Sequence, residues 1–288
     1  MIFFRLSENN NNNYLDKLCI EYGYDKISDI KINELYFSFV STHGLDEYVY
    51  IEGDYYSLFI AGDFIEHTST IELDIKNKLN EVAGFLISKC NGEIYPVSDK
   101  LGFGLLYYRT DGVIALSNLA SSISIPNDIL SLDFESVESF INDGYIKEDK
   151  TYYQYVKCCN TDEQLIFNLD KTITKKIKHH DLSFNINKNE RLDYVNDILD
   201  ESFEKILSKY EPGDFICTLS GGQDSRLLLS HFTKKHKSIT TLTFGHERCR
   251  DFKIVNKLRD LNGFEAVTYD ISNEPIIKSR TEYVLATD

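Results

Sequence analysis

The sequence predicts an α+β domain of antiparallel sheets followed by an α/β domain with a parallel sheet. Before residue 125, short β-branched and aromatic runs alternate with Gly-containing turns, which is typical of antiparallel strands. After residue 189 the apolar residues recur at helical spacing, and from there strands alternate with single helices. Such alternation indicates right-handed βαβ units. At 288 residues the chain is long enough for two domains, which we place at 1–183 and 184–288.

The first half contains six strand-like segments, at 48–51, 56–60, 83–88, 93–97, 105–108 and 113–117. Asn91-Gly92 predicts a two-residue hairpin turn of type I′, because this dipeptide tolerates the positive φ angles of that turn. Asp111-Gly112 repeats the signal. Residues 132–183 predict a helix near 136–141 and two or three further strands.

The second half begins with apolar residues at helical spacing, which predict a helix that ends at Pro212-Gly213. These are Leu192, Val195, Leu199, Phe203, Ile206 and Leu207. Apolar runs at 215–219, 239–244 and 266–271 predict strands. Helices are expected at 226–235 and 251–262, between those strands.

Charge and cysteine content exclude several classes of function. The net charge of −15 argues against nucleic-acid and membrane partners, which need clustered Lys and Arg. The six cysteines have no C-x-x-C spacing, so we expect reduced thiols in a cytoplasmic protein. Neither the cysteines nor His179-His180 predict a metal site.

Ser220-Gly221-Gly222-Gln223-Asp224-Ser225 lies between a predicted strand and a predicted helix, where open α/β sheets bind ligands. Gly221 and Gly222 let the backbone approach an anion, and the following helix presents free N–H groups. Ser220 and Ser225 add hydroxyl donors. Asp224 suits a Mg²⁺ ion that bridges phosphates. The alternative is a Gly-Gly turn in which Asp and Ser cap the helix without a ligand.

The stretch from Leu219 to Ser225 resembles the PP-loop of N-type ATP pyrophosphatases and is most similar to that of the asparagine synthetase family. Thr243-Phe244-Gly245 with Asp251, residues 99–118 and residues 143–170 are similar to further segments of that family, in the family's order. The resemblance implies an N-terminal glutaminase-type domain with antiparallel sheets of the N-terminal-nucleophile (Ntn) hydrolase kind. It implies a PP-loop domain, similar to adenine nucleotide alpha hydrolases, after it.

The resemblance implies an AMP-forming ligase that uses ATP and Mg²⁺. A small-molecule or peptide carboxylate is adenylated with release of pyrophosphate, and ammonia or an amine then displaces AMP to form an amide. The loop 220–225 would hold pyrophosphate, Asp224 would carry Mg²⁺, and Leu219, Phe244 and Gly245 would contact adenosine through backbone groups. The catalytic groups are not assigned. Arg226 stands where asparagine-forming members commonly have a small residue, so we do not name aspartate as the substrate.

The chain departs from the family's glutaminase pattern at two places. Glutamine-dependent members begin, after Met removal, with a nucleophilic Cys, whereas Ile2 stands here. The segment 61–67 matches the family's oxyanion-hole segment by position, with Ala61 in place of Asn and Gly62 retained. "NGEIY" at 91–95 looks similar to that segment but lies at the wrong position. We therefore expect no glutaminase activity.

The resemblance also implies a second phosphate-side loop and a helical region beyond residue 288. We expect the α/β domain to be incomplete at its C-terminus, as a fragment, as a protein completed by a second polypeptide, or as a degenerate remnant. We also expect that the protein can form a homodimer. The competing function is a non-catalytic nucleotide- or partner-binding protein. A PP-loop enzyme of tRNA modification fits the motif but not the charge of −15.

Overall fold

The protein forms two compact units, Met1–Asp181 and Leu182–Thr287. The computed structural model describes residues 2–8, 15–16, 19–20, 23–41, 48–64, 79–98, 104–124, 132–161, 163–177, 191–208, 216–235 and 239–272. The predicted boundary at 183/184 lies outside the described residues, as do His179-His180 and the predicted helix end at Pro212-Gly213.

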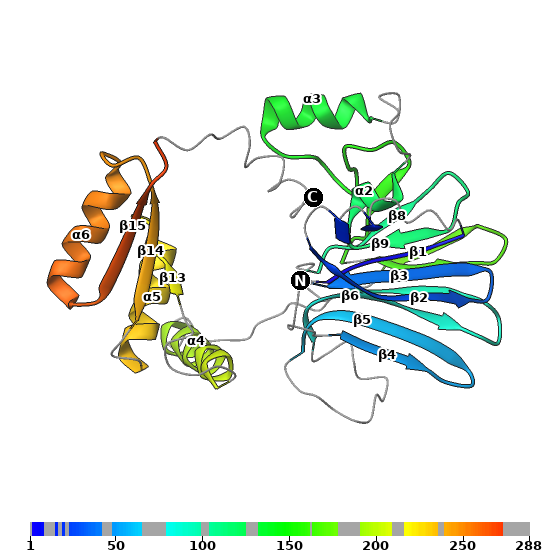
Figure 1. Cartoon of the computed structure of the whole chain (residues 1–288), viewed down its shortest axis with the longest axis horizontal. Coiled ribbons are helices and arrows are strands. Elements are labelled where there is room, and N and C mark those ends of the chain that lie inside the picture. The colour runs from blue at the N-terminus through cyan, green and yellow to red at the C-terminus, as the bar shows by residue number, and fades with distance from the viewer. Residues whose placement is uncertain are drawn as a thin grey trace. The chain divides into compact units, whose positions relative to one another are not determined.

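The first unit contains two six-stranded sheets in which every neighbouring pair is antiparallel (Figure 1, blue to green). One sheet has the order β10 (Val156–Cys158), β8 (Tyr107–Arg109), β9 (Ala115–Ser117), β1 (Ile2–Ser7), β3 (Leu35–Ser41), β2 (Asp25–Ile32). The other has the order β12 (Ile173–Ile177), β11 (Glu163–Phe167), β7 (Ile94–Ser98), β6 (Leu79–Ser88), β5 (Tyr56–Phe64), β4 (Tyr48–Glu52).

Aromatic side chains from both sheets form the core of this unit. Successive strand residues point to opposite faces, so alternate positions of each strand can enter the layer between two sheets. Phe4 of β1 and Phe37 of β3 meet Phe59 of β5 at ring-centroid distances of 5.1 and 4.7 Å. Phe85 of β6 lies edge-on to Phe37 at 5.0 Å. All four side chains are fully buried, so the two sheets share one hydrophobic core.

The predicted elements of this unit are present. The six predicted strands correspond to β4 to β9, the predicted helix is α3 (Phe134–Asp143), and the three strands after it are β10 to β12. A one-turn helix, α2 (Ala120–Ile123), packs on the sheet that contains β8 and β9. Strands β1 to β3 were not predicted individually.

The predicted hairpins form, but their turns are not of type I′. That turn needs positive φ at both central residues, and here Gly92 has φ +70° while Asn91 does not have a positive φ. The loop is longer, since Ser88 N–H donates to the Glu93 carbonyl (2.9 Å) and Gly92 N–H donates to the Ser88 carbonyl (2.8 Å). In the second hairpin, likewise, Gly112 alone of the predicted pair has positive φ, at +81°.

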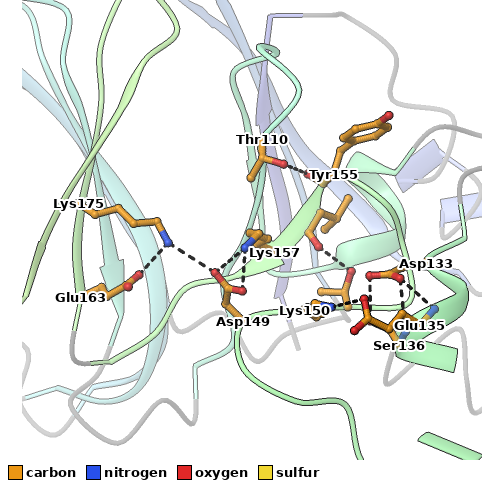
Figure 2. Close-up of polar contacts among 12 residues, drawn as sticks. Thr110, Asp133, Glu135, Ser136, Asp149, Lys150, Tyr155, Lys157, Glu163 and Lys175 are labelled. Atoms are coloured by element: carbon orange, nitrogen blue, oxygen red, sulfur yellow. Dashed lines mark hydrogen bonds and ion pairs between the residues drawn. The ribbon is translucent and has the colours of Figure 1, made fainter. Parts of the chain in front are cut away.

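Charged side chains link the edge strands of the two sheets (Figure 2). The buried Asp149 carboxylate accepts hydrogen bonds from Lys157 Nζ of β10 at 2.9 Å and from Lys175 Nζ of β12 at 3.5 Å. Lys175 also pairs with Glu163 of β11 at 3.1 Å. Burial raises the pKa of the Asp149 carboxyl, but the two lysines outweigh burial, and the net pKa lies below the ordinary value. Charges on edge strands also oppose pairing with another sheet.

The second unit contains the predicted parallel sheet, and its strands lie in the order β13 (Ile216–Thr218), β14 (Thr240–Gly245), β15 (Glu265–Asp270). The helices α5 (Gln223–Lys235) and α6 (Arg250–Asn262) connect these strands. Their apolar residues pack with those of the sheet around Leu219, Leu229, Val255 and Phe264. The fold of the described chain is therefore mixed α+β, with mostly antiparallel sheets and one small parallel sheet.

The helix α4 (Arg191–Leu207) precedes the sheet and contacts α5 through its second half. Phe203 stacks on His231 with ring centroids 5.3 Å apart, and His231 Nδ1 lies 2.7 Å from an oxygen of Asp200. Leu192 and Val195, in the first half of the predicted apolar stripe, are exposed. Among the described helices, none has both the length and the apolar character needed to span a bilayer.

Within the residues that the structure describes, the other face of the parallel sheet is open. It carries Ile216, Phe244, Val267 and Tyr269, which are 64, 61, 43 and 51% exposed. Parallel sheets usually have both faces covered, but the described helices α5 and α6 contribute only to the core on the opposite face.

Candidate functional site

The candidate site is the loop that joins β13 to α5 at the carboxyl end of the parallel sheet. Its first residue, Leu219, is buried and is held by β14. Leu219 N–H donates to the Leu242 carbonyl at 2.9 Å, and Thr243 Oγ1 donates to the Leu219 carbonyl at 2.7 Å. The loop therefore starts from a fixed point on the neighbouring strand. Leu219 is predicted to contact adenosine through backbone groups, and its N–H and its carbonyl both already have a partner on β14.

Two serine hydroxyls close the loop on itself. Ser220 N–H donates to Ser225 Oγ at 3.2 Å, and Gly222 N–H donates to Ser220 Oγ at 3.1 Å. The two hydroxyl oxygens are 3.0 Å apart. Because each hydroxyl both donates and accepts, the pair can also turn toward a ligand oxygen. This geometry suits both a capped helix start and an anion site.

Gly221 and Gly222 have different environments, although the sequence predicts that both approach an anion. Gly221 N–H donates to Asp251 Oδ1 of α6 at 3.1 Å. A Cβ at Gly221 would lie 2.6 Å from that oxygen and 2.8 Å from Ile254 Cδ1, so both side chains of α6 would have to move to admit a larger residue there. A Cβ at Gly222 would meet only Ser220 Oγ, at 3.1 Å, and Gly222 is exposed. Gly222 is thus the glycine that a ligand can approach.

Asp224 and Ser225 lie in the first turn of α5, which begins at Gln223 rather than at the predicted residue 226. Asp224 is exposed. The described residues contain no group of three or more His, Cys, Asp or Glu side chains placed to hold a metal. Mg²⁺ usually binds through one or two carboxylates together with substrate phosphates. The residues present therefore fit a Mg²⁺ ion that arrives with a polyphosphate, held by Asp224.

Phe244 and Gly245 lie at the carboxyl end of β14, next to the loop. Thr218 pairs with Leu242 in the parallel ladder, so Ser220 of the loop and Phe244 of β14 each follow two residues after this pair. The Gly245 carbonyl accepts a hydrogen bond from Ile271 N–H at 3.1 Å. The structure thus brings all the predicted nucleotide-contacting residues to one edge of the sheet.

Two residues at the loop were not assigned a role from the sequence. Asp251 was noted only as part of the resemblance, and Arg226 only as a departure from it. In the structure, Asp251 accepts from Gly221, and Arg226 Nε donates to the Gly222 carbonyl at 2.9 Å. Asp251 lies in the first turn of α6, which follows β14, the strand next to the loop. This position in the sequence is the signal that predicts a contact of Asp251 with the loop.

The glutaminase-type positions of the first unit lie in its hydrophobic core. Ile2 and Ala61 are 8 and 5% exposed and belong to one cluster of buried apolar side chains. Gly62 has φ +140° at a β-bulge of β5. In the "NGEIY" segment, Ile94 is buried in the same core, so this segment is a structural hairpin.

Comparison with known proteins adds no family to this description. The chain matches no protein-family model and no curated protein sequence.

Proposed function

We propose that this protein binds ATP, as its magnesium complex, at residues 219–225 and acts as an asparagine synthetase-like, AMP-forming amide ligase. The observation that carries the proposal is the loop itself. Two hydroxyls, an exposed glycine and an exposed acid lie together between a parallel strand and a helix N-terminus. Helix N-termini and such loops favour phosphate. The proposed folds are an Ntn-hydrolase-like first unit and a PP-loop second unit, on the sequence resemblance stated above.

In this proposal the loop binds and orients the pyrophosphate part of ATP. The hydroxyls of Ser220 and Ser225 donate to phosphate oxygens. Asp224 would hold Mg²⁺, which would supply positive charge to the pyrophosphate. An oxygen of the substrate carboxylate attacks the α-phosphorus, and pyrophosphate leaves with the electron pair of the broken P–O bond. Ammonia or an amine then attacks the acyl carbon, loses a proton and displaces AMP.

The nitrogen comes from outside the first unit in this proposal. Ile2 and Ala61 are buried apolar side chains, and neither carries a group able to attack glutamine or to donate to an oxyanion. Free ammonia, or an amine on a second substrate, is therefore the proposed nucleophile.

A second candidate function is supported by the open face of the parallel sheet. Ile216, Phe244 and Tyr269 are more than half exposed there, and exposed apolar patches mark interaction sites. A non-catalytic nucleotide- or partner-binding protein would also keep the loop.

The test is a pair of measurements on the full chain. Calorimetry with ATP and Mg²⁺ compares wild type with Asp224→Asn, and Asp260→Asn is the matched control because Asp260 lies in the last turn of α6. We expect Asp224→Asn to weaken ATP binding about tenfold or more in Mg²⁺ and the control to leave it unchanged. ATP–pyrophosphate exchange with candidate carboxylates then tests adenylation. ATP binding without exchange would favour a nucleotide-binding protein, and no ATP binding would reject the ligase and leave partner binding as the remaining function.

A further inference from the structure

Arg226 reaches back from α5 to the loop. Side chains on a helix tilt toward its N-terminus, and the Arg226 side chain follows this direction, since its Nε donates to the Gly222 carbonyl at 2.9 Å. Among the described hydrogen bonds and ion pairs of residues 219–225, Arg226 supplies the one basic side chain. The bond through Nε leaves four N–H donors on the two Nη groups. Within the described residues, these donors make no hydrogen bond or ion pair.

Two acids also lie at the loop. Asp251 contacts the loop at Gly221 N–H, and Asp224 lies in the first turn of the helix that follows. The N–H groups of Ser220, Gly221 and Gly222 all have partners within the protein. An incoming pyrophosphate therefore meets two carboxylates and a loop whose first backbone donors are engaged. Like charges a few ångströms apart repel strongly enough to require a compensating cation.

We propose that Arg226 is an anion-binding residue of this loop, whose guanidinium gives it affinity for pyrophosphate even without a metal ion. This inference rests on the proposed function. Anchored through Nε, the planar guanidinium presents its Nη groups in a fixed orientation, a geometry that recognises phosphate oxygens better than a lysine ammonium does. Arg226 and a bound Mg²⁺ ion would then both offset the negative charge of pyrophosphate, which lies near the carboxylates of Asp224 and Asp251.

The experiment measures binding of inorganic pyrophosphate to the full chain by calorimetry, once in EDTA and once in Mg²⁺. Arg226→Gln is the main variant, because its amide can still donate to the Gly222 carbonyl while the charge is removed. Arg226→Lys keeps the positive charge but lacks the planar guanidinium with its two Nη groups. Arg259→Ala is the matched control, since Arg259 lies in the last turn of α6 and pairs with the adjacent Asp260.

We expect Arg226→Gln to weaken pyrophosphate binding about tenfold in EDTA and only about twofold in Mg²⁺, with Arg226→Lys between it and wild type. The dependence of wild-type affinity on salt concentration should also be steeper than that of Arg226→Gln, because one fewer charge contact remains. A role in loop structure alone would lower thermal stability without changing the salt dependence.

Three results would overturn the inference. Arg226→Gln and wild type binding equally well in EDTA would show that the guanidinium does not contact the anion, and the proposed function would stand. An equal loss in Arg259→Ala would show a general effect of net charge. No pyrophosphate binding by wild type under either condition would reject this inference and the proposed function together. If Arg226→Gln does not fold, Arg226→Lys provides the test. Wild-type affinity for pyrophosphate in Arg226→Lys would contradict a role for the oriented guanidinium.

Discussion

Replacing each glycine of the loop by alanine separates packing from ligand access. In Gly221→Ala the new methyl would lie 2.6 Å from Asp251 Oδ1 and 2.8 Å from Ile254 Cδ1. Ordinary contacts of a Cβ are 3.4–4 Å. The Asp251 and Ile254 side chains must therefore move, and the hydrogen bond from Gly221 N–H to Asp251 must weaken or break. In Gly222→Ala the methyl meets only Ser220 Oγ, at 3.1 Å.

The expected free energies of unfolding differ accordingly. Overpacking costs about 1–3 kcal/mol, and losing a hydrogen bond costs about 0.5–1.5 kcal/mol. Alanine also lowers the conformational entropy of the unfolded chain relative to glycine, which stabilises both variants by about 0.4–1 kcal/mol. Gly221→Ala should thus destabilise the second unit by about 2 kcal/mol. Gly222→Ala should stay within about 0.5 kcal/mol of wild type and should weaken pyrophosphate binding, because its methyl lies on the exposed side of the loop.

The assay is amide hydrogen exchange in α5 and α6 of the full chain at several urea concentrations, which reports the stability of this unit separately. Pyrophosphate binding is measured on the same samples. The reasoning is refuted if Gly222→Ala destabilises α5 and α6 as much as Gly221→Ala does. It is equally refuted if Gly221→Ala is as stable as wild type, since the Asp251 and Ile254 side chains would then move without any loss of stability.

Two further predictions concern the charged and polar contacts of the two units. Asp149→Asn should destabilise the first unit by about 1–2 kcal/mol near pH 7. Because the folded pKa of Asp149 lies below its unfolded value, its contribution is present above the unfolded pKa and is lost as pH falls through the folded pKa. Urea titrations from pH 7 to pH 2 should therefore show wild type and variant converging in acid, and a constant difference would contradict this. His231→Ala should weaken the contact of α4 with α5 by about 2 kcal/mol through loss of the Asp200 hydrogen bond and the Phe203 stack, measured as faster exchange in α4 and in the facing part of α5; equal exchange in wild type and variant would contradict this.

Local patterns predicted most elements because each depends on residues close in sequence. Alternating apolar residues place β4 to β7 within a few residues of their predicted ranges, and helical spacing predicts α6 to within one residue of its start. The start of α5 was predicted three residues late, because Gln223 to Ser225 were assigned to the phosphate loop rather than to the helix. The prediction of a type I′ turn at Asn91 was wrong for another reason, because the register between β6 and β7 sets the length of the loop.

Some features carried no local signal. Strands β1 to β3 were not separately predicted, although β1 lies in the middle of its sheet between β9 and β3. Its six residues are all buried, so it shows no alternation of apolar and polar residues. The open face of the parallel sheet was also not foreseen. An apolar strand residue has the same appearance in sequence whether its face is covered or not.

The sequence by itself determined the two kinds of sheet, their order along the chain and the position of the loop between β13 and α5. Tertiary structure alone decided which partners the loop atoms have. Gly221 N–H meets Asp251, which is thirty residues away, only because parallel strands bring the starts of α5 and α6 to the same edge. Likewise, Ile2 and Ala61 share one core only because two sheets pack face to face. Periodicity is encoded over a few residues, whereas these contacts depend on how whole elements pack.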